Sequence, residues 1–241
     1  MPITVKCLAS GSTGNSYAVD DGASVLLLEA GIPAKKILSG YLDLLPRVAG
    51  ALISHGHGDH ASGASGIAAA GIDLYATAGT FTEAEDHFGP IDRPYRKHTV
   101  RVGEQFDLDS WIVMPFETKH DAMEPCGYLL YSKTTQERLL FATDTYFIPN
   151  TFRALNVVML ECNYSLPLLD KAIADGTTPG FIKPRLLQSH FGLENVKDFF
   201  RVNDMSAVRK IYLIHISRGN GDPEQFVREV RRITRASVSA F

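Results

Sequence analysis

The sequence lacks the features that mark membrane, exported or polyanion-binding proteins. No stretch of its 241 residues approaches the roughly 18 consecutive apolar residues of a membrane span. A formal net charge of −3 gives no overall attraction to polyanions. The N-terminal residues enter a strand pattern directly, without the charged and apolar regions of a signal peptide. We therefore expect a cytoplasmic protein with no membrane association.

Cysteine is also scarce, and no linker or low-complexity segment interrupts the chain. Cys7, Cys126 and Cys162 are an odd number of cysteines without the spacing of a metal site, which predicts buried thiols in a reducing compartment. A hydrophobic content of 45% is enough for one large core. The sequence thus predicts a single domain over residues 1–241.

Strand and helix patterns alternate along the whole length. Strands are predicted at Ile3–Ala9, Ser16–Val19, Ser24–Glu29, Ala49–Ser54, Asp73–Ala76, Val100–Val102, Gln105–Leu108, Trp111–Glu117, Gly127–Ser132, Arg138–Ala142, Val157–Leu160 and Lys210–His215. Helices are predicted at Pro33–Leu45, Ala61–Ala70, Thr80–His87, Leu166–Ala174, Phe181–Gln188 and Leu193–Val202, with a last helix capped by Asp222. Two strand-rich halves with helices outside indicate an α/β sandwich of two sheets covered on both faces.

A histidine cluster follows one of the predicted strands. Three histidines and an aspartate, His55, His57, Asp59 and His60, lie within six residues directly after the apolar run 49–53. Residues two apart on an extended strand end point the same way, and the next two begin a turn into a helix. As an alternative, these four residues could simply be exposed polar residues in a glycine-rich turn. Imidazole and carboxylate groups at this spacing, however, suit zinc, iron or manganese. The pattern predicts a metal-binding loop.

Further ligand-type residues stand where other strands end. His120 follows the strand at 111–118, Asp144 follows 138–142, and His215 ends 210–214. Each of them alone could be a capping or solvent-facing residue. Their repetition at strand ends favours one shared site.

The motif His55-x-His57-x-Asp59-His60, with His120, Asp144 and His215 in order, resembles the metallo-β-lactamase fold, a four-layer αβ/βα sandwich, and this likeness spans the chain. Within that superfamily the sequence is similar to the WalJ-type (YycJ-type) metallohydrolases and their phage or prophage relatives. The segments that carry this second likeness are 7–15, 26–31, 119–125, 142–145 and 213–217. One departure is Glu29, at a position where the superfamily usually has an aspartate that supports the metal loop.

The resemblance implies a dinuclear site of two divalent ions, with Zn²⁺ favoured and Mn²⁺ or Fe²⁺ as alternatives. One ion would be held by His55, His57 and His120, and the other by Asp59, His60 and His215, with Asp144 bridging them. Two such ions share a hydroxide whose pKa they depress toward neutrality, and they can clamp both oxygens of a phosphodiester. A histidine at position 57, where redox-active diiron relatives carry a glutamate, indicates hydrolysis.

Two more motifs favour a phosphodiesterase. Glu161 ends the apolar strand 157–160, and His190 stands before a helix. They resemble the glutamate and histidine with which tRNA-processing relatives protonate the leaving oxygen, so we expect Glu161 to orient His190 and His190 to donate the proton. Asp59 is counted as a catalytic residue as well as a ligand. The alternative is a hydrogen-bonding role for His190 at the helix entry and a buried ion pair for Glu161.

Substrate contacts are less well marked. The loop that holds Ser10, Ser12 and Asn15 could present N–H groups to a phosphate, although a turn between strands explains it equally, and Asn163 beside Glu161 is a further candidate. A basic segment, Arg93, Arg96, Lys97, His98 and Arg101, could follow a nucleic-acid backbone or form a solvated face.

The expected function is therefore a metal-dependent phosphodiesterase or nuclease, exonuclease-like on DNA, with nucleic acid or another phosphodiester as its partner. The alternative is a small-molecule hydrolase that uses the same metals on a cyclic nucleotide, a lactone or a thioester. A positive groove would favour a polymer and a closed pocket a small molecule. Oligomeric state stays open, with a homodimer as one candidate.

Overall fold

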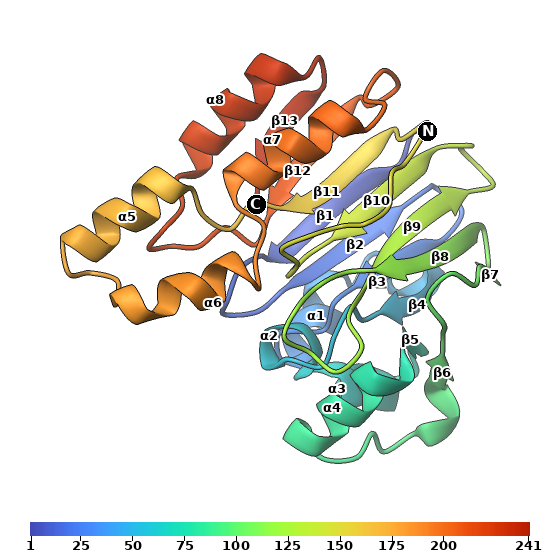
Figure 1. Ribbon diagram of the computed structural model, residues 1–241. Coiled ribbons are helices and arrows are strands. Elements are labelled where there is room, and N and C mark those ends of the chain that lie inside the picture. The colour runs from blue at the N-terminus through green and yellow to red at the C-terminus, as the bar shows by residue number, and fades with distance from the viewer. The chain divides into compact units, whose positions relative to one another are not determined.

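A computed structural model describes all residues 1–241, which divide into two compact units. Unit 1 comprises Met1–Phe116 and Ala122–Glu137, and unit 2 comprises Glu117–Asp121 and Arg138–Phe241. Both units contain strands and helices, and the strands belong to two sheets, so the expected α/β class is confirmed (Figure 1). None of the helices has the length and apolar character needed to cross a membrane. The single-domain organisation stays a prediction.

Unit 1 begins with a sheet in which six strands follow their order in the sequence, β1 to β6. The elements of unit 1 are, in order, β1 (Thr4–Ala9), β2 (Ser16–Asp20), β3 (Val25–Leu28), α1 (Ala34–Gly40), η1 (Leu45–Arg47), β4 (Val48–Leu52), α2 (Gly58–Ala61), α3 (Ala64–Ala69), β5 (Leu74–Ala76), α4 (Ala78–Phe88), η2 (Pro94–Arg96), β6 (Lys97–Thr99), β7 (Phe106–Leu108), β8 (Trp111–Glu117) and β9 (Cys126–Ser132). The last residue of β8 starts the short segment 117–121 of unit 2.

The pairing of these strands changes from antiparallel to parallel at β3. The β1–β2 and β2–β3 pairs are antiparallel hairpins, whereas β3–β4, β4–β5 and β5–β6 are parallel pairs. Parallel neighbours need crossover connections, and α1, α3 and α4 lie in them. Residues from α1, α3 and α4, including Ile37, Ile67 and Phe81, join strand residues in one buried cluster. The carboxyl ends of β3 and β4 therefore stand side by side, where a site is expected in such a sheet.

Unit 2 contains four neighbouring parallel strands and the remaining helices. The elements are β10 (Arg138–Ala142), β11 (Val157–Glu161), α5 (Leu166–Ala174), η3 (Gly180–Ile182), α6 (Lys183–Leu187), α7 (Leu193–Val202), β12 (Lys210–Ile214), α8 (Pro223–Ile233) and β13 (Ser237–Ala240). β11 pairs with β10 and β12, and β12 with β13, all in parallel. Helix α8 packs on β12 and β13 and contacts α7 (Figure 1). Asp222 caps α8 by accepting a hydrogen bond from the Gln225 amide, as expected.

Several predicted boundaries are wrong. Residues 100–102 are not a strand; β6 lies at Lys97–Thr99, where pairing with β5 overrides its polar sequence. The helix expected at 33–45 ends at Gly40, and the one expected at 61–70 is divided into α2 and α3 at Gly63, whose amide donates to the Ala30 carbonyl. Strand β13 was not expected.

All three cysteines are free thiols, as the sequence predicts. Cys126 and Cys162 are buried, and Cys7 is half-buried. Burial raises the pKa of Cys126 to about 12, so this thiol stays protonated near neutral pH.

Candidate metal centre

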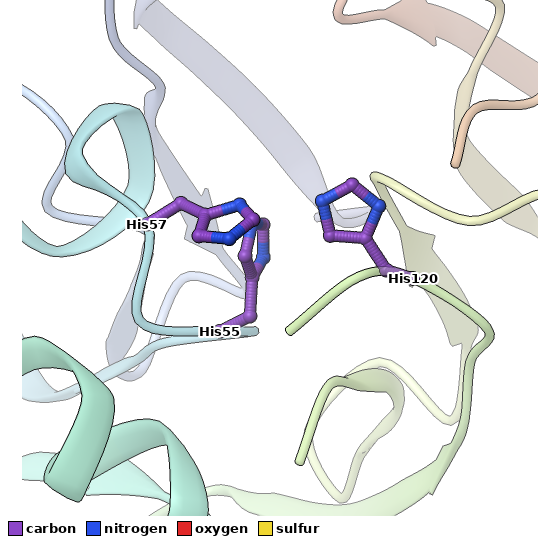
Figure 2. Close-up of side chains that lie close together, drawn as sticks. All are labelled: His55, His57 and His120. Carbon is purple, nitrogen blue, oxygen red and sulfur yellow. The ribbon is translucent and has the colours of Figure 1, made fainter. Parts of the chain in front are cut away.

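The histidine cluster of unit 1 occupies the loop after β4 and the short helix α2. The His55 ring lies 4.7 Å from the His57 ring and 4.1 Å from the His60 ring, measured between centroids. Figure 2 shows His55 and His57 on this loop, and it shows His120 on the segment that follows β8. His55 and His60 are buried, and Asp59 stands in the first turn of α2. We call His55, His57, Asp59 and His60 the ligand loop.

Glu29 supports the ligand loop from the end of the neighbouring strand. The Glu29 amide donates to the carbonyl of Leu52, the last residue of β4, at 2.9 Å, which continues the β3–β4 pairing one residue beyond β3. Its Oε1 accepts from the Ser54 amide at 3.1 Å, and its Oε2 lies 3.2 Å from His60 Nδ1. If the His60 Nδ1–H donates to Glu29, the ring nitrogen without a proton is Nε2, which lies 3.4 Å from Asp59 Oδ2.

Helix α4 contributes Glu83, which sequence reasoning missed. Glu83 Oε2 accepts from the Gly56 amide at 3.1 Å, and Oε1 lies 3.6 Å from His57 Nε2. A Cβ at position 56 would stand 2.6 Å from the Glu83 Cβ, so only glycine lets the loop approach α4 this closely. No local signal marks Glu83, because the packing of α4 on the loop places it there.

Asn15 joins the serine- and glycine-containing turn to the ligand loop. Its Oδ1 accepts from the Gly11 amide, and its Nδ2 donates to the Asp59 carbonyl at 3.0 Å and lies 3.2 Å from His60 Nε2. The Tyr17 hydroxyl donates to the same Oδ1. Asn15 is completely buried, so this side chain links the β1–β2 turn to α2.

In unit 2, strand register gathers residues that are far apart in the sequence. Leu160 of β11 pairs with Ala142 of β10 and with Leu213 of β12. Because these strands are parallel and in register, the residues that follow them meet at one edge. Asp144, Glu161 and His215 accordingly lie together: His215 Nδ1 is 3.1 Å from Asp144 Oδ1 and 3.2 Å from Glu161 Oε1.

Three of these strand-end residues have left-handed backbone conformations. Glu29 has a φ of 66°, Asp144 of 44° and His215 of 52°. Positive φ is uncommon outside glycine and costs free energy, and it collects at functional sites where the surroundings impose it. At each of these positions the chain turns sharply as its strand ends.

His120 is oriented by a main-chain carbonyl. Its Nδ1 lies 2.8 Å from the Ser189 carbonyl oxygen, which can only accept, so Nδ1 carries a proton. Its Nε2 lies 3.3 Å from Asp121 Oδ1 and 3.6 Å from Asp144 Oδ2. Burial lowers the pKa of His120, although Asp144 opposes this, so the neutral ring turns a lone pair toward two carboxylates. Acceptors that face one another without a proton fit a cation between them.

Glu161 accepts from several donors in a completely buried position. Its Oε1 lies 2.7 Å from His190 Nδ1, and its Oε2 accepts from the amides of Thr145 and Phe191 at 3.0 and 3.1 Å. Burial raises the pKa of Glu161, but the charge and hydrogen bond of His190 more than offset it. For His190, burial lowers the pKa, while Glu161 and Asp144 outweigh it and raise the pKa. The ring of His190 stands 5.5 Å from that of His120.

Asp121 and Arg185 form an ion pair at the edge of this group that sequence reasoning missed. Arg185 Nε donates to Asp121 Oδ2 at 3.0 Å, and the Arg185 side chain remains 76% exposed. Burial raises the pKa of Asp121, but the hydrogen bond and the charge of Arg185 lower it, and the net shift is downward. Arg185 lies on helix α6, and no sequence motif in or before this helix indicates a contact with Asp121.

The remaining candidates have varied surroundings. Asn163 is buried and donates from Nδ2 to the His215 carbonyl at 3.0 Å, and Ser10 Oγ lies 2.8 Å from the Tyr17 hydroxyl oxygen. Ser12 is exposed. In the basic segment, Arg96 and Lys97 are paired with Asp73 and Glu85, respectively, as on a solvated face. Substrate contacts at Ser10, Ser12, Asn15 and Asn163 stay a prediction.

Known exonucleases resemble this chain over most of its length. Exodeoxyribonuclease WalJ of Streptococcus pneumoniae is 28% identical over 229 residues, which cover 90% of this chain and 82% of the relative. Exodeoxyribonuclease YycJ of Bacillus anthracis is 29% identical over 250 residues, which cover 99% of this chain and 89% of the relative. The expected likeness to this type of metallohydrolase is confirmed.

Solved structures show the same fold at low sequence identity. The metallo-β-lactamase fold protein YhfI from Bacillus subtilis has a TM-score of 0.71 at 12% identity, covering 100% of this chain and 97% of its own. A diphosphatase from the PhnP family has a TM-score of 0.67 at 17% identity over 100% and 95%, and the short form of human tRNase Z one of 0.66 at 14% over 98% and 95%. The expected metallo-β-lactamase fold is therefore confirmed. The family model described as the beta-lactamase superfamily domain matches residues 27–216, well over half of the sequence, and the chain belongs to this superfamily.

Proposed function

We propose that this protein is a metal-dependent phosphodiesterase that shortens DNA from its ends. The superfamily supplies the hydrolytic class, and the two exodeoxyribonuclease relatives supply the DNA substrate. The observation that carries the proposal is the 2.7 Å contact between His190 and the buried Glu161, because it supplies a proton donor for an alkoxide leaving group.

The ligand set follows the superfamily pattern. His55, His57 and His120 would hold one divalent ion, and Asp59, His60 and His215 the other, with Asp144 shared between the two. The neutral His120 ring, with its Nε2 turned toward carboxylates, supports this assignment. Histidine-rich sites take Zn²⁺ readily, and Mn²⁺ and Fe²⁺ are the alternatives. When bound, such a pair depresses the pKa of water and neutralises phosphate oxygens.

The chain's own residues would then position and move protons. The Nδ1–H of His190 donates a hydrogen bond to Glu161 and stays on the ring. When the ring is an imidazolium, its Nε2–H is the proton that the leaving 3′ or 5′ oxygen would take. Glu161 is held by the amides of Thr145 and Phe191, so it cannot follow the ring if the ring moves. Asp59, at the start of α2, would orient the attacking water and take its proton.

The test compares metal-reconstituted protein with two aspartate variants on four substrates. Asp144→Asn removes the shared carboxylate, and Asp109→Asn is its control, because Asp109 also has a positive φ but is exposed in the β7–β8 turn. The substrates are end-labelled single-stranded DNA, double-stranded DNA, RNA and bis(p-nitrophenyl) phosphate. Each is incubated with Zn²⁺ or Mn²⁺.

We expect DNA to be shortened from an end by wild type and Asp109→Asn and not by Asp144→Asn. Cleavage of the small diester alone would replace the proposal with a small-molecule phosphodiesterase. Inertness of every metal form toward all four substrates would contradict phosphodiester hydrolysis altogether and point to lactone or thioester substrates.

A further inference from the structure

A cavity in unit 2 lies next to the proposed catalytic residues and has no part in the mechanism above. Its volume is about 390 Å³, within the range of small-ligand sites. Six of the residues that line it are Tyr146, Phe147, Ile148, Asn195, Phe191 and Phe199. We call it the aromatic cavity. Most of its walls come from the loop after Asp144 and from helix α7.

The walls of the aromatic cavity are tied to the site by short stretches of chain. Tyr146 and Phe147 follow Asp144 by two and three residues, and Phe191 directly follows His190. Thr145 fixes the turn, since its hydroxyl donates to the Phe147 carbonyl at 2.8 Å and accepts from the Lys119 amide at 2.9 Å. Residues two apart in sequence lie within roughly 7 Å at their Cα atoms. A group bound in the cavity would therefore sit within reach of a phosphate held at Asp144.

The lining combines exposed aromatic rings with a buried apolar floor. Phe147 is 53% and Tyr146 39% exposed, whereas Ile148, Phe191 and Phe199 are buried. Exposed aromatic rings on an ordered turn next to a site are typical of surfaces that stack nucleobases.

The polar groups around the cavity fit a nucleotide. Asn195 at the rim is exposed and could hydrogen-bond a base edge. The Asp198 carboxylate in the wall is paired with Arg201 at 2.7 Å, which compensates its charge.

We propose that the aromatic cavity binds one nucleobase of the DNA chain close to the scissile phosphate by stacking on Phe147 and Tyr146. This inference rests on the proposed nuclease function and adds a subsite to it. Because every base has a π face, such a subsite would hold the strand without reading its sequence.

The first test scans an end-labelled single strand with one abasic nucleotide at each of the terminal positions. Because stacking on an aromatic ring stabilises the bound base, the missing base should lower kcat/KM roughly ten-fold at one position for wild type. Phe147→Ala should lower kcat/KM on intact DNA by a similar factor and respond no further to the abasic position.

The control for this scan is Phe181→Ala, which removes a phenylalanine that is 83% exposed on η3 and lines no part of the cavity. It should behave as wild type. Asn195→Ala is the second variant. It should change KM and leave kcat as in wild type. An abasic penalty that is the same in Phe147→Ala and in wild type, or no penalty at any position, would overturn the inference.

A binding measurement separates this inference from the proposed function. The fluorescence of 2-aminopurine in a short single-stranded oligonucleotide should be quenched by wild type and Phe181→Ala, and not by Phe147→Ala. If no DNA is cleaved under any condition, the nuclease proposal fails, but this quenching pattern would still support the base site. Equal quenching by all three proteins would overturn the base site even if DNA is cleaved.

Discussion

The two groups of candidate ligands differ in how the chain assembles them. In unit 1 the four members of the ligand loop lie within six residues, so one strand end and one helical turn bring them together. In unit 2 Asp144 and His215 follow separate strands whose ends are gathered by parallel register, and His120 lies in the segment after β8. Sequence spacing therefore describes the first group directly, whereas the second depends on topology.

The supporting carboxylates differ in the same way. Glu29 in unit 1 contacts one amide and one histidine, at Ser54 and His60. Glu161 in unit 2 contacts two amides and two histidines. A buried carboxylate with more partners leaves more groups unsatisfied when it changes. Substitutions in unit 2 should thus affect turnover more than matching ones in unit 1.

The largest effect is expected for Glu161→Gln. The glutamine side chain has one acceptor oxygen in place of two, so it cannot accept from both backbone amides and both histidines. His190 also loses the charge that orients it, so kcat should fall by about 10²–10⁴. Steady-state kinetics on single-stranded DNA measures this loss. Glu229→Gln, which changes a surface pair with Lys197, is the control and should leave kcat unchanged. A Glu161→Gln enzyme within a factor of two of wild type would contradict the role of this residue.

A smaller effect is expected for the matching change in unit 1, Glu29→Gln. It keeps the volume but removes the charge opposite His60 Nδ1, and loss of such a partner typically weakens metal binding about 10–100-fold. Titration of the metal-free protein with Zn²⁺ against a competing chelator gives the affinity. Glu104→Gln, at an exposed glutamate of the same unit, should bind as wild type. Unchanged affinity in Glu29→Gln would remove Glu29 from the support of the loop.

Gly56→Ala tests how tightly the ligand loop is packed. The added Cβ would stand 2.6 Å from the Glu83 Cβ and 2.8 Å from the Ala84 nitrogen, so the loop or α4 must move at a cost of about 1–3 kcal/mol. Urea denaturation measures this as a lower free energy of unfolding. Gly219→Ala is the control, since a Cβ there meets nothing within 4 Å. Equal stability of the two variants would show that the close approach at Gly56 is not required.

The smallest effect is expected away from both groups, for Arg47→Met. Arg47 makes two 2.6 Å contacts to Asp20, and its hydrogen bond lowers the pKa of that carboxyl. A partly exposed pair of this kind contributes up to about 1 kcal/mol. Because the folded-state pKa of Asp20 is depressed, this contribution is complete above the unfolded-state pKa of about 4 and is lost as the pH falls through the folded-state value.

Urea denaturation at several pH values tests this dependence. Arg47→Met should be less stable than wild type at pH 7, and the difference should shrink at acidic pH. A difference that does not change with pH would assign the loss to packing of the arginine stem.

Local patterns predicted much of the fold, and long-range pairing decided the rest. The ligand loop, most of the strands and the Asp222 cap follow from residues that are neighbours in sequence. β6 has the polar sequence KHT, and β13 has the short sequence SVSA with one large apolar residue. Neither strand therefore carries a clear hydrophobic pattern of its own. Their strand partners, β5 and β12, decide where they form.

The candidate site shows the same division. The residues that supply imidazole or carboxylate groups at strand ends were recognisable by type and position. Glu83, Asp121 and Arg185 acquire their contacts only when α4 and α6 are placed, so spacing could not identify them. Positive φ at Glu29, Asp144 and His215 is likewise a tertiary effect, since none of these residue types requires it.

The central claim is that His190 with Glu161 supplies a proton to the leaving oxygen, while the other candidate histidines and carboxylates hold the metals. The direct test is to compare wild type with His190→Ala on DNA and on the p-nitrophenyl ester of thymidine 5′-phosphate, with the metal content of each protein measured beforehand. We predict full metal content in both proteins, a loss of at least about 10² in kcat on DNA, and little change on the p-nitrophenyl ester, whose leaving group needs no proton. Equal losses on both substrates, or a loss of metal, would contradict the account.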